Sequence, residues 1–282
     1  MNWADFCYTG LIFMSVSALF YTIIRTKDKF LIPLFFLTVG MIFFGEYLVL
    51  FVFEGYIYKV DYFKEFYYNN YTGHIISNAL SLPATAVLVA GFSLKFRHIL
   101  GITLFFVGVE WLFLKLDIYE HRWWNLSFTA IALISLFVIV KKWYGYIKAP
   151  ASPLLMGFGY VCILFSLHIL LREFPLGVVL NKIKYSPGWF ENPLRDSGVF
   201  YPLVGVTKSF IDTFFLRYVN NRYLAVVLMV STSVLLDILL KSLNLMIFEG
   251  IGILGLIIIE VLIICVFVLI EEFILVKKLS KL

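Results

Sequence analysis

Acidic residues inside apolar runs are the residues of this chain that could do chemistry. Glu46, Glu110 and Asp237 each lie near the middle of a run long enough to cross a membrane. Burying a charged group at bilayer depth costs about 2.5–3.5 kcal/mol on insertion scales, so such groups face the protein interior and mark functional sites by default. Two carboxylates at close range cannot both ionise, so a facing pair would share a proton. That chemistry suits a proton-coupled carrier, and it also suits a neutral pair that only holds helices together.

Other ionisable groups also lie within the apolar runs. Lys208 and Asp212 are four residues apart and share one helix face, where they could neutralise each other without any further role. Glu260 lies well inside the last apolar run. With the three acids above, we take His168, Lys208 and Asp212 as candidate ligand-binding or proton-binding residues.

Histidine and cysteine spacing does not predict a metal site. His74, His121 and His168 could meet Glu120 near the external side, but no His-x-x-x-His or His-Glu-x-x-His spacing supports a metal centre there. The three cysteines are scattered, without the spacing of a zinc site or a disulfide framework. The chain also has no phosphate-binding loop, dinucleotide fingerprint or covalent-haem motif. We therefore expect no metal, no cofactor and no catalytic residue.

The composition predicts the class of protein that must position these groups. The chain has 282 residues, of which 62% are hydrophobic, and a mean hydropathy of +0.94, whereas soluble domains are about 45–50% apolar. The run 251–270 is apolar on every face, unlike the alternating strands of a transmembrane barrel. We predict an all-α, polytopic membrane bundle of nine helices. The expected spans are residues 8–24, 31–53, 74–94, 98–116, 123–140, 153–171, 199–216, 223–246 and 250–276.

Basic residues fall in alternate connections between these spans. The connections after the first, third, fifth and seventh spans, with the C-terminal tail, hold 13 of the 23 Lys and Arg residues and a single acid, Asp28. Because Lys and Arg favour cytoplasmic loops, the N-terminus is predicted outside and the C-terminus inside. The longer segments 56–72 and 172–197 are then external. The net charge of +5 reflects this topology and does not indicate nucleic acid.

Aromatic residues crowd the predicted external side. Eight Tyr and Phe residues lie between Tyr56 and Tyr71, and Trp123 and Trp124 begin a predicted helix. Amphipathic rings favour the headgroup region, so an interfacial belt is one interpretation. A ligand vestibule lined by the rings is the other. Pro83 predicts a kink in the third span.

The two halves of the chain follow one plan. Each has a helix with an ionisable group (Glu46, His168), a long aromatic segment, a basic turn and a helix with a central acid (Glu110, Asp237). The copies begin four helices apart and therefore run in the same direction across the membrane, as the parallel repeats of secondary transporters do. The predicted organisation within one compact membrane domain is an extra helix and basic turn at 1–30, a four-helix unit at 31–148 and a second unit at 149–282.

Short runs in the first half carry a resemblance to a known family. The runs from Gly73 to Pro83, from Val109 to Trp111 and from Tyr119 to Asn125 resemble a small, uncharacterised five-helix membrane protein family of spore-forming Firmicutes. The resemblance covers residues 31–147, and the second half matches only in outline. It implies a bacterial cytoplasmic membrane protein with a mid-membrane acid, here Glu110, and no established activity to transfer. It also implies an interface element that consists of His121, Trp123, Trp124 and Asn125.

Two functions remain open from the sequence. One is a carrier or binder of a small molecule, with or without coupling to protons, in which Glu46, Glu110 and Asp237 line an interior site. The other is a non-enzymatic structural or assembly protein whose buried acids pair helices. No reaction motif is complete, so an intramembrane enzyme is not predicted. The expected partners are the lipid bilayer and either another membrane protein or a second copy of the chain.

Overall fold

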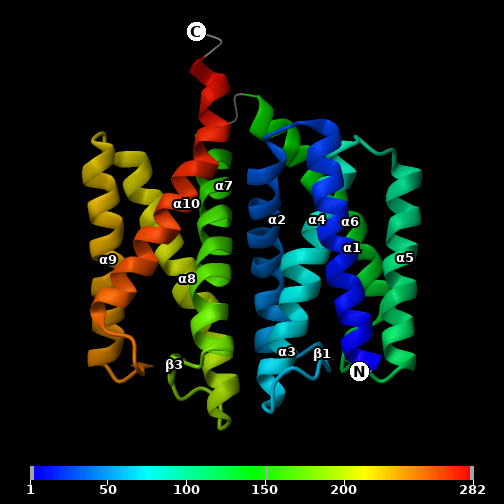
Figure 1. The fold of residues 1–282 in the computed structure, drawn as a ribbon, viewed down its shortest axis with the longest axis horizontal. Helices are drawn as coiled ribbons and strands as arrows, with labels where there is room; N and C mark the ends of the chain where they lie inside the picture. The colour runs from blue at the N-terminus through cyan, green and yellow to red at the C-terminus, as the bar shows by residue number, and fades with distance from the viewer. Residues whose placement is uncertain (1–2, 150–151, 280–282) are drawn as a thin grey trace. The chain divides into compact units, whose positions relative to one another are not determined.

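The computed structural model describes residues 3–149 and 152–279, with side chains described as far as residue 273. The side chains of the basic C-terminal tail lie outside this part. The chain forms two compact units, residues Met1–Ala151 (unit 1) and Ser152–Leu282 (unit 2). Among the described residues, nine helices are long and apolar enough to cross a membrane (Figure 1). The predicted all-α polytopic class is therefore confirmed.

Unit 1 combines five spans with one two-stranded β-ribbon. Three of the spans are single α-helices, and two contain π-helical segments. Strands β1 and β2 pair antiparallel, with Tyr56 opposite His121 and Tyr58 opposite Tyr119. The elements in chain order are α1 (Trp3–Thr26), α2 (Leu31–Glu46) with π-helix η1 (Tyr47–Val52), β1 (Tyr56–Tyr58), α3 (Phe66–His74) with π-helix η2 (Ile75–Ser81) and α4 (Leu82–Gly91), α5 (Phe96–Lys115), β2 (Tyr119–His121) and α6 (Leu126–Lys148).

Unit 2 combines four spans with a second two-stranded ribbon. Strands β3 and β4 pair antiparallel, with Tyr185 opposite Met246. The elements in chain order are α7 (Pro153–His168) with π-helix η3 (Ile169–Val179), β3 (Ile183–Tyr185), α8 (Pro193–Tyr218), α9 (Arg222–Ser242), β4 (Met246–Phe248) and α10 (Ile253–Leu279).

Corresponding elements of the two units lie 127 residues apart in sequence. Strands β1 and β3 begin at Tyr56 and Ile183, and 183 minus 56 is 127; β2 and β4 begin at Tyr119 and Met246, and 246 minus 119 is again 127. A duplication would produce this constant spacing, and the repeat predicted from the sequence stays a prediction. Residues with positive φ keep the same spacing in two pairs, Glu54 with Asn181 and Asp117 with Asn244.

The spacing of 127 residues also pairs ionisable residues of the two units. Glu110 corresponds to Asp237, as the sequence predicts. Glu46 corresponds to Glu173, however, and not to His168. The order of helices and loops along the sequence pairs Glu46 with His168, whereas the strands and helix ends define the register directly.

Several helices extend beyond their predicted bounds. The third and seventh spans begin at Phe66 and Pro193 instead of 74 and 199, and the sixth continues to Val179 instead of 171. Polar and charged residues continue these helices because their side chains find partners inside the unit. The two ribbons were not predicted, since strands of three residues are too short for a detectable alternation.

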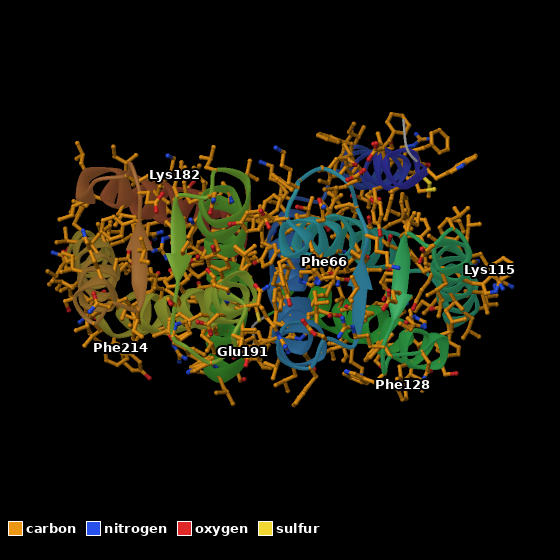
Figure 2. The ribbon with its side chains drawn as sticks, turned by 90° about the horizontal axis from the view of Figure 1, so that it is seen from below. Phe66, Lys115, Phe128, Lys182, Glu191 and Phe214 are labelled. Carbon is orange, nitrogen blue, oxygen red and sulfur yellow. The ribbon has the colours of Figure 1, made fainter. Side chains whose placement is uncertain are left out.

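The side chains on the outside of each unit are largely apolar. Phe128 of unit 1 is 43% exposed and Phe214 of unit 2 is 56% exposed, and both point away from the neighbouring helices (Figure 2). In water such surfaces would drive association. Against lipid tails they need no protein partner, which is the environment that the nine apolar helices imply.

The end of unit 1 away from its ribbon is held by polar contacts of the basic loops. Tyr144 Oη of α6 donates to Asp28 Oδ2 at 2.6 Å, and Lys148 forms an ion pair with the same carboxylate. Burial raises the pKa of Asp28, but the hydrogen bonds from Lys148, Tyr144 and the Phe30 amide outweigh it and hold the pKa below its usual value. Lys141 Nζ caps the end of the third span by donating to the Leu94 carbonyl at 2.7 Å.

Candidate functional site

The three acids predicted near the middle of their spans lie closer to the ribbon ends. The spans that hold Glu46, Glu110 and Asp237 end six, five and five residues later, at Val52, Lys115 and Ser242. At 1.5 Å per residue this is about 8–9 Å from the helix end. The predicted ends at 53 and 116 lie within one residue of the observed ends, so Glu46 and Glu110 were already near the ends of the predicted spans and not at their middle; only for Asp237 did a predicted end at 246, four residues too late, place the acid too deep.

A cavity of about 110 Å³ lies inside unit 1, between the spans and the ribbon. We call it the acid–tyrosine cavity, since Glu46 and Glu110 line it together with three tyrosines of the ribbon. A single water needs about 10–15 Å³ by the same kind of measure, so there is room for several waters or a small ligand. Its main polar and aromatic lining residues are Tyr8, Glu46, Tyr56, Tyr58, Ser77, Asn78, Glu110, Tyr119, Trp124 and Thr129.

Glu46 stands at the point where α2 becomes π-helical, and Tyr56 of β1 donates a hydrogen bond to its Oε2. Asn78 of η2 donates to the hydroxyl oxygens of Tyr56 and Tyr58 at 3.3 and 3.4 Å. Asn78 Nδ2 also lies 2.8 Å from Nδ1 of the buried His74. Both acid and amide thus come from helices with π segments, which re-aim side chains and are frequent at functional sites. Pro83 is the second residue of α4, just after η2, and it has no N–H to donate to the helix there.

Glu110 of α5 has its partners on β2 and α6. Its Oε1 lies 2.6 Å from His121 Nε2 and accepts a hydrogen bond from Thr129 Oγ1 at 3.0 Å. Trp124 Nε1 donates to the same threonine oxygen at 2.7 Å. Glu110 is 11% exposed and faces the cavity with its remaining surface. Two residues of the predicted interface element are therefore linked to Glu110: His121 contacts it directly, and Trp124 contacts it by way of Thr129.

The other two residues of the interface element have local roles. Trp123 Nε1 donates to the Phe53 carbonyl at 2.8 Å, which ties the start of α6 to the end of η1. Asn125 is the N-cap of α6, since its side chain accepts from the amides of Ser127 and Phe128. The helix begins after Asn125 and not at Trp123 as predicted.

The rings of Tyr56, Tyr58, Tyr119 and Trp124 form one contiguous aromatic wall of the cavity. Their centroids are 5.0 Å apart for Tyr58 and Tyr119, 5.3 Å for Tyr56 and Tyr119, and 5.9 Å for Tyr56 and Trp124. Burial, and next the charge of Glu46, raises the pKa of Tyr56 well above its usual value, and burial likewise raises the pKa of Tyr58 and Tyr119. These tyrosines therefore stay protonated, and Tyr56 donates to Glu46. They line a cavity, whereas other rings of the same segment, such as Tyr62, are exposed.

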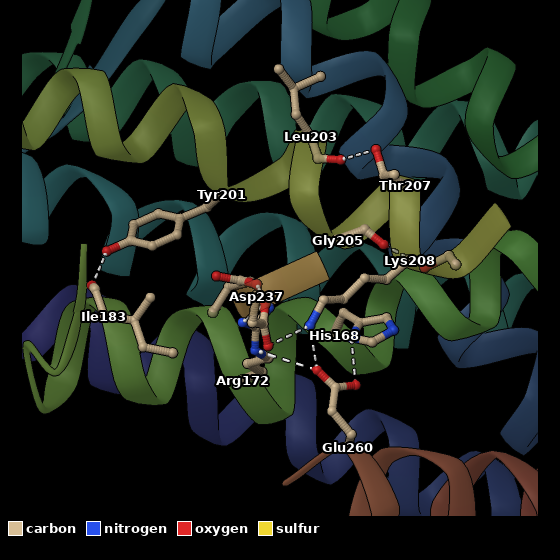
Figure 3. Close-up of polar contacts among 12 residues, drawn as sticks. His168, Arg172, Ile183, Tyr201, Leu203, Gly205, Thr207, Lys208, Asp237 and Glu260 are labelled. Atoms are coloured by element: carbon tan, nitrogen blue, oxygen red, sulfur yellow. Dashed lines mark hydrogen bonds and ion pairs between the residues drawn. The ribbon is translucent and has the colours of Figure 1, made fainter. Parts of the chain in front are cut away.

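Unit 2 has a buried ion-pair network at the corresponding depth (Figure 3). Every member is at most 1% exposed, and the members come from α7, η3, α8, α9 and α10. The network consists of His168, Arg172, Glu173, Lys208, Asp212, Asp237 and Glu260.

Arg172 is the centre of this network. Its Nη1 donates to Glu173 Oε1 and its Nη2 to Asp237 Oδ1, both at 2.7 Å, and its Nε lies 3.5 Å from Glu260 Oε1. Lys208 Nζ donates to Asp237 Oδ2 at 3.0 Å and to Glu260 Oε1 at 2.5 Å. One guanidinium and one ammonium thus join carboxylates of η3, α9 and α10.

Lys208 and Asp212 do not form the helical pair that their spacing predicts. Lys208 turns to Asp237 and Glu260, as above, while Asp212 Oδ2 lies 3.3 Å from His168 Nε2. The prediction was wrong because carboxylates of the neighbouring helices reach Lys208 at better distances than one on its own helix.

The network contains more acids than bases. Four carboxylates face the permanent cations of Arg172 and Lys208, and His168 is the only other base among the network residues. With all four acids ionised, the formal charge is −2 if His168 is neutral and −1 if it is protonated. Since unpaired buried charge is strongly unfavourable, we expect the network to hold at least one proton on an acid. Glu110 and Asp237 have partners within their own units, and the idea that they share a proton stays a prediction.

Sequence reasoning missed Arg172 and Glu173, which it assigned to an external loop. Both are fully buried within η3. The apolar run that continues from Phe174 to Leu180 could have revealed that the helix does not end at Leu171. Pro175 argued for a boundary at that point, but the segment accommodates it as a π-helix.

Metal ligation finds no support in the part of the chain that the structure describes, where no group of three His, Cys, Asp or Glu side chains is arranged to hold an ion. His74, His121 and His168 have separate neighbours: Asn78, Glu110 and Asp212.

Comparison with known proteins adds no relative: the chain matches no family model, no curated protein and no solved structure. The resemblance of residues 31–147 to the Firmicutes family stays a prediction.

Proposed function

We propose that this multi-pass membrane protein binds a small molecule in the acid–tyrosine cavity of unit 1, as a binder or as the substrate site of a carrier. The single observation that carries the proposal is the cavity itself, whose lining includes two carboxylates and seven aromatic side chains. Ligand sites combine mostly apolar walls with a few placed polar groups, which describes this lining. A bacterial cytoplasmic membrane location and coupling to protons belong to the same proposal.

The backbone around the cavity supports a binding role. Glu46 precedes η1, and Ser77 and Asn78 lie within η2. Irregular helices in membranes are tolerated where they are buried in protein or line a cavity, and transporters build substrate sites from such helices. Two neighbouring π segments that contribute cavity residues follow this pattern.

A thermal-shift screen of the purified protein tests the proposal. The probes are small cations, small anions and neutral polar molecules, and a bound ligand at 100 times its Kd stabilises by about 2.7 kcal/mol. Ala132 lines the cavity on α6, so Ala132→Phe fills part of it, and Ala130→Phe on the same helix is the matched control. Stabilisation of the wild type that the cavity variant loses and the control keeps is the expected result. Absence of stabilisation by every class of probe would overturn the proposal.

The second candidate function is structural, and unit 2 supplies the observation that favours it. Its acids are fully buried and directly paired with Arg172, Lys208 or His168, so they join helices without a ligand. Under this alternative the acids of unit 1 would also serve only to join helices. Amide variants of Glu46 and Glu110 distinguish the two functions, because a structural role predicts loss of stability with no change in the binding of any probe.

A further inference from the structure

We infer that the ligand of the acid–tyrosine cavity is a small organic cation with an ammonium or guanidinium group. The inference rests on the proposed function and names its ligand class. It is drawn from a comparison of the two units at positions 127 residues apart, together with the charge, the rings and the size of the cavity.

Unit 2 shows what occupies the space between the corresponding acids. Glu173 and Asp237 stand where unit 1 has Glu46 and Glu110, by the spacing of the strands and helix ends. In unit 2 the guanidinium of Arg172 bridges the two carboxylates, with both Nη–O distances at 2.7 Å (Figure 3 shows the contact with Asp237). The frame that holds the two acids therefore accommodates one planar cation between them.

Unit 1 has the acids without this cation. The position that corresponds to Arg172 is Gly45, since 172 minus 127 is 45. The residues that line the cavity include no Lys or Arg. His121 contacts Glu110 from β2, and Tyr56 donates to Glu46, but neither places a permanent charge between the two acids. An external cation would take the place that Arg172 fills in unit 2.

The aromatic wall favours an organic cation over an inorganic one. Tyr56, Tyr58, Tyr119 and Trp124 present ring surfaces to the cavity, and cations bind over such faces, most strongly when water is excluded. Small hard ions need six or more oxygen ligands, which a wall of rings does not supply. Unit 2 has Ile183, Met246 and Ile251 in place of Tyr56, Tyr119 and Trp124. Tyr58 alone keeps its ring, as the buried Tyr185, so three of the four rings of the wall occur only in the unit that lacks the internal cation.

Charge and volume limit the ligand further. The two carboxylates exclude anions, since like charges repel and no cation of the lining compensates them. The cavity of about 110 Å³ admits a head group of a few heavy atoms. A free amine and the ammonium head group of a lipid share this chemistry, and the experiment must separate these two sources.

Binding of named probes to the full-length protein in phosphatidylglycerol nanodiscs tests the inference. The probes are guanidinium, methylammonium and tetramethylammonium chlorides, with sodium chloride at equal ionic strength, and urea and acetamide as neutral isosteres. Binding is measured by calorimetry and by the change in unfolding temperature. We expect at least one organic cation to bind and the sodium salt and neutral isosteres to bind at least about tenfold more weakly. A parallel series in discs containing phosphatidylethanolamine identifies the lipid as the source if its head group competes with the probes.

Three variants test whether the cation binds between Glu46 and Glu110. Glu46→Gln and Glu110→Gln remove one charge each and should weaken cation binding by about tenfold or more. Gly45 is exposed and a Cβ there meets nothing within 4 Å, so Gly45→Arg should fold; its long side chain starts one residue before Glu46 and should compete with the probes for the acids, which lowers their affinity. Glu120→Gln is the matched control, because Glu120 lies on β2 but pairs with Lys59, and it should bind as the wild type does.

The outcomes distinguish a wrong ligand class from a wrong proposed function. If the neutral isosteres bind as tightly as the cations, or if the folded Glu46 and Glu110 variants bind cations as the wild type does, the ligand class is wrong and the binding cavity stands. If no probe of any charge binds, the proposed function fails as well. Unfolding temperatures and gel-filtration profiles show which variants are folded, and if one amide variant does not fold, the other decides.

Discussion

Replacement of Lys208 by methionine measures what the ion-pair network contributes to unit 2. Lys208 is fully buried, and its Nζ donates to Asp237 and Glu260. Methionine keeps the length and most of the volume of the side chain but removes the charge. Asp237 retains a hydrogen bond from Arg172, whereas Glu260 loses the shortest of its contacts and keeps only ion-pair distances of 3.5 and 3.8 Å.

The magnitude follows from the carboxylate that is left behind. Removing one partner of a buried ion pair costs about 3–5 kcal/mol, because the other charge stays buried without compensation. The loss should therefore be near 3 kcal/mol, since Arg172 partly compensates Glu260. Removing both charges is different: apolar replacements of a buried pair are often neutral or stabilising. We expect the double variant Lys208→Met, Glu260→Met to lose less than about 2 kcal/mol, so the two single effects are strongly non-additive.

Unfolding in mixed micelles of increasing dodecyl sulfate fraction, followed by circular dichroism, gives the free energies of the wild type, both single variants and the double variant. Lys182→Met, an exposed lysine of the same unit, is the matched control and should change stability by less than about 0.5 kcal/mol. Equal losses for Lys208→Met and Lys182→Met would refute the network as a stabilising element. Additive single effects would refute a direct pairing of Lys208 with Glu260.

Three further predictions concern unit 1, each measured as the free energy of unfolding. Asp28→Asn should cost up to about 1 kcal/mol at neutral pH. Because the pKa of Asp28 in the folded protein lies below its unfolded value, the carboxylate stabilises the protein above about pH 4, and this stabilisation disappears as the pH falls. Equal losses at pH 7 and pH 3 would contradict this explanation. Gly73→Ala should cost about 1–3 kcal/mol, since its Cβ would lie 2.3 Å from the Cβ of Tyr58, whereas Gly101→Ala meets nothing within 4 Å and should not destabilise. Asn125→Ala should lose about 1 kcal/mol with its helix cap, and Asn125→Asp, which keeps the acceptor, should lose little.

The nine spans were predictable because hydropathy reports them directly. Their ends were not, since a helix continues wherever its polar side chains find partners inside the protein. Arg172 and Glu173 show the limit: read along the chain, two adjacent charges before a proline indicate a loop, and only the contact with Asp237, 65 residues away, explains their burial. Hydropathy contains no information about such long-range pairing.

The acids of the candidate site could be predicted from the sequence, but the residues that surround them could not. Glu46 and Glu110 stood out as charges in apolar runs, and both line the cavity. Their neighbours Tyr56 and Tyr119 come from strands of three residues, which no periodic pattern marks. The tyrosine-rich segment left two interpretations open, and only the ribbon pairing decides which rings turn inward.

The difference between the two units lies in where the compensating cation comes from. Both units hold a pair of carboxylates at the ribbon end of the bundle, and a pair of buried carboxylates needs a proton or a cation to be stable. Unit 2 provides Arg172 and closes the space with Lys208 and Glu260, at positions where unit 1 has Gly45, Ser81 and Leu133. Unit 1 leaves the space open and surrounds it with rings. Under the proposed function, the same acid pair joins helices where the chain itself provides the cations and binds a ligand where it does not.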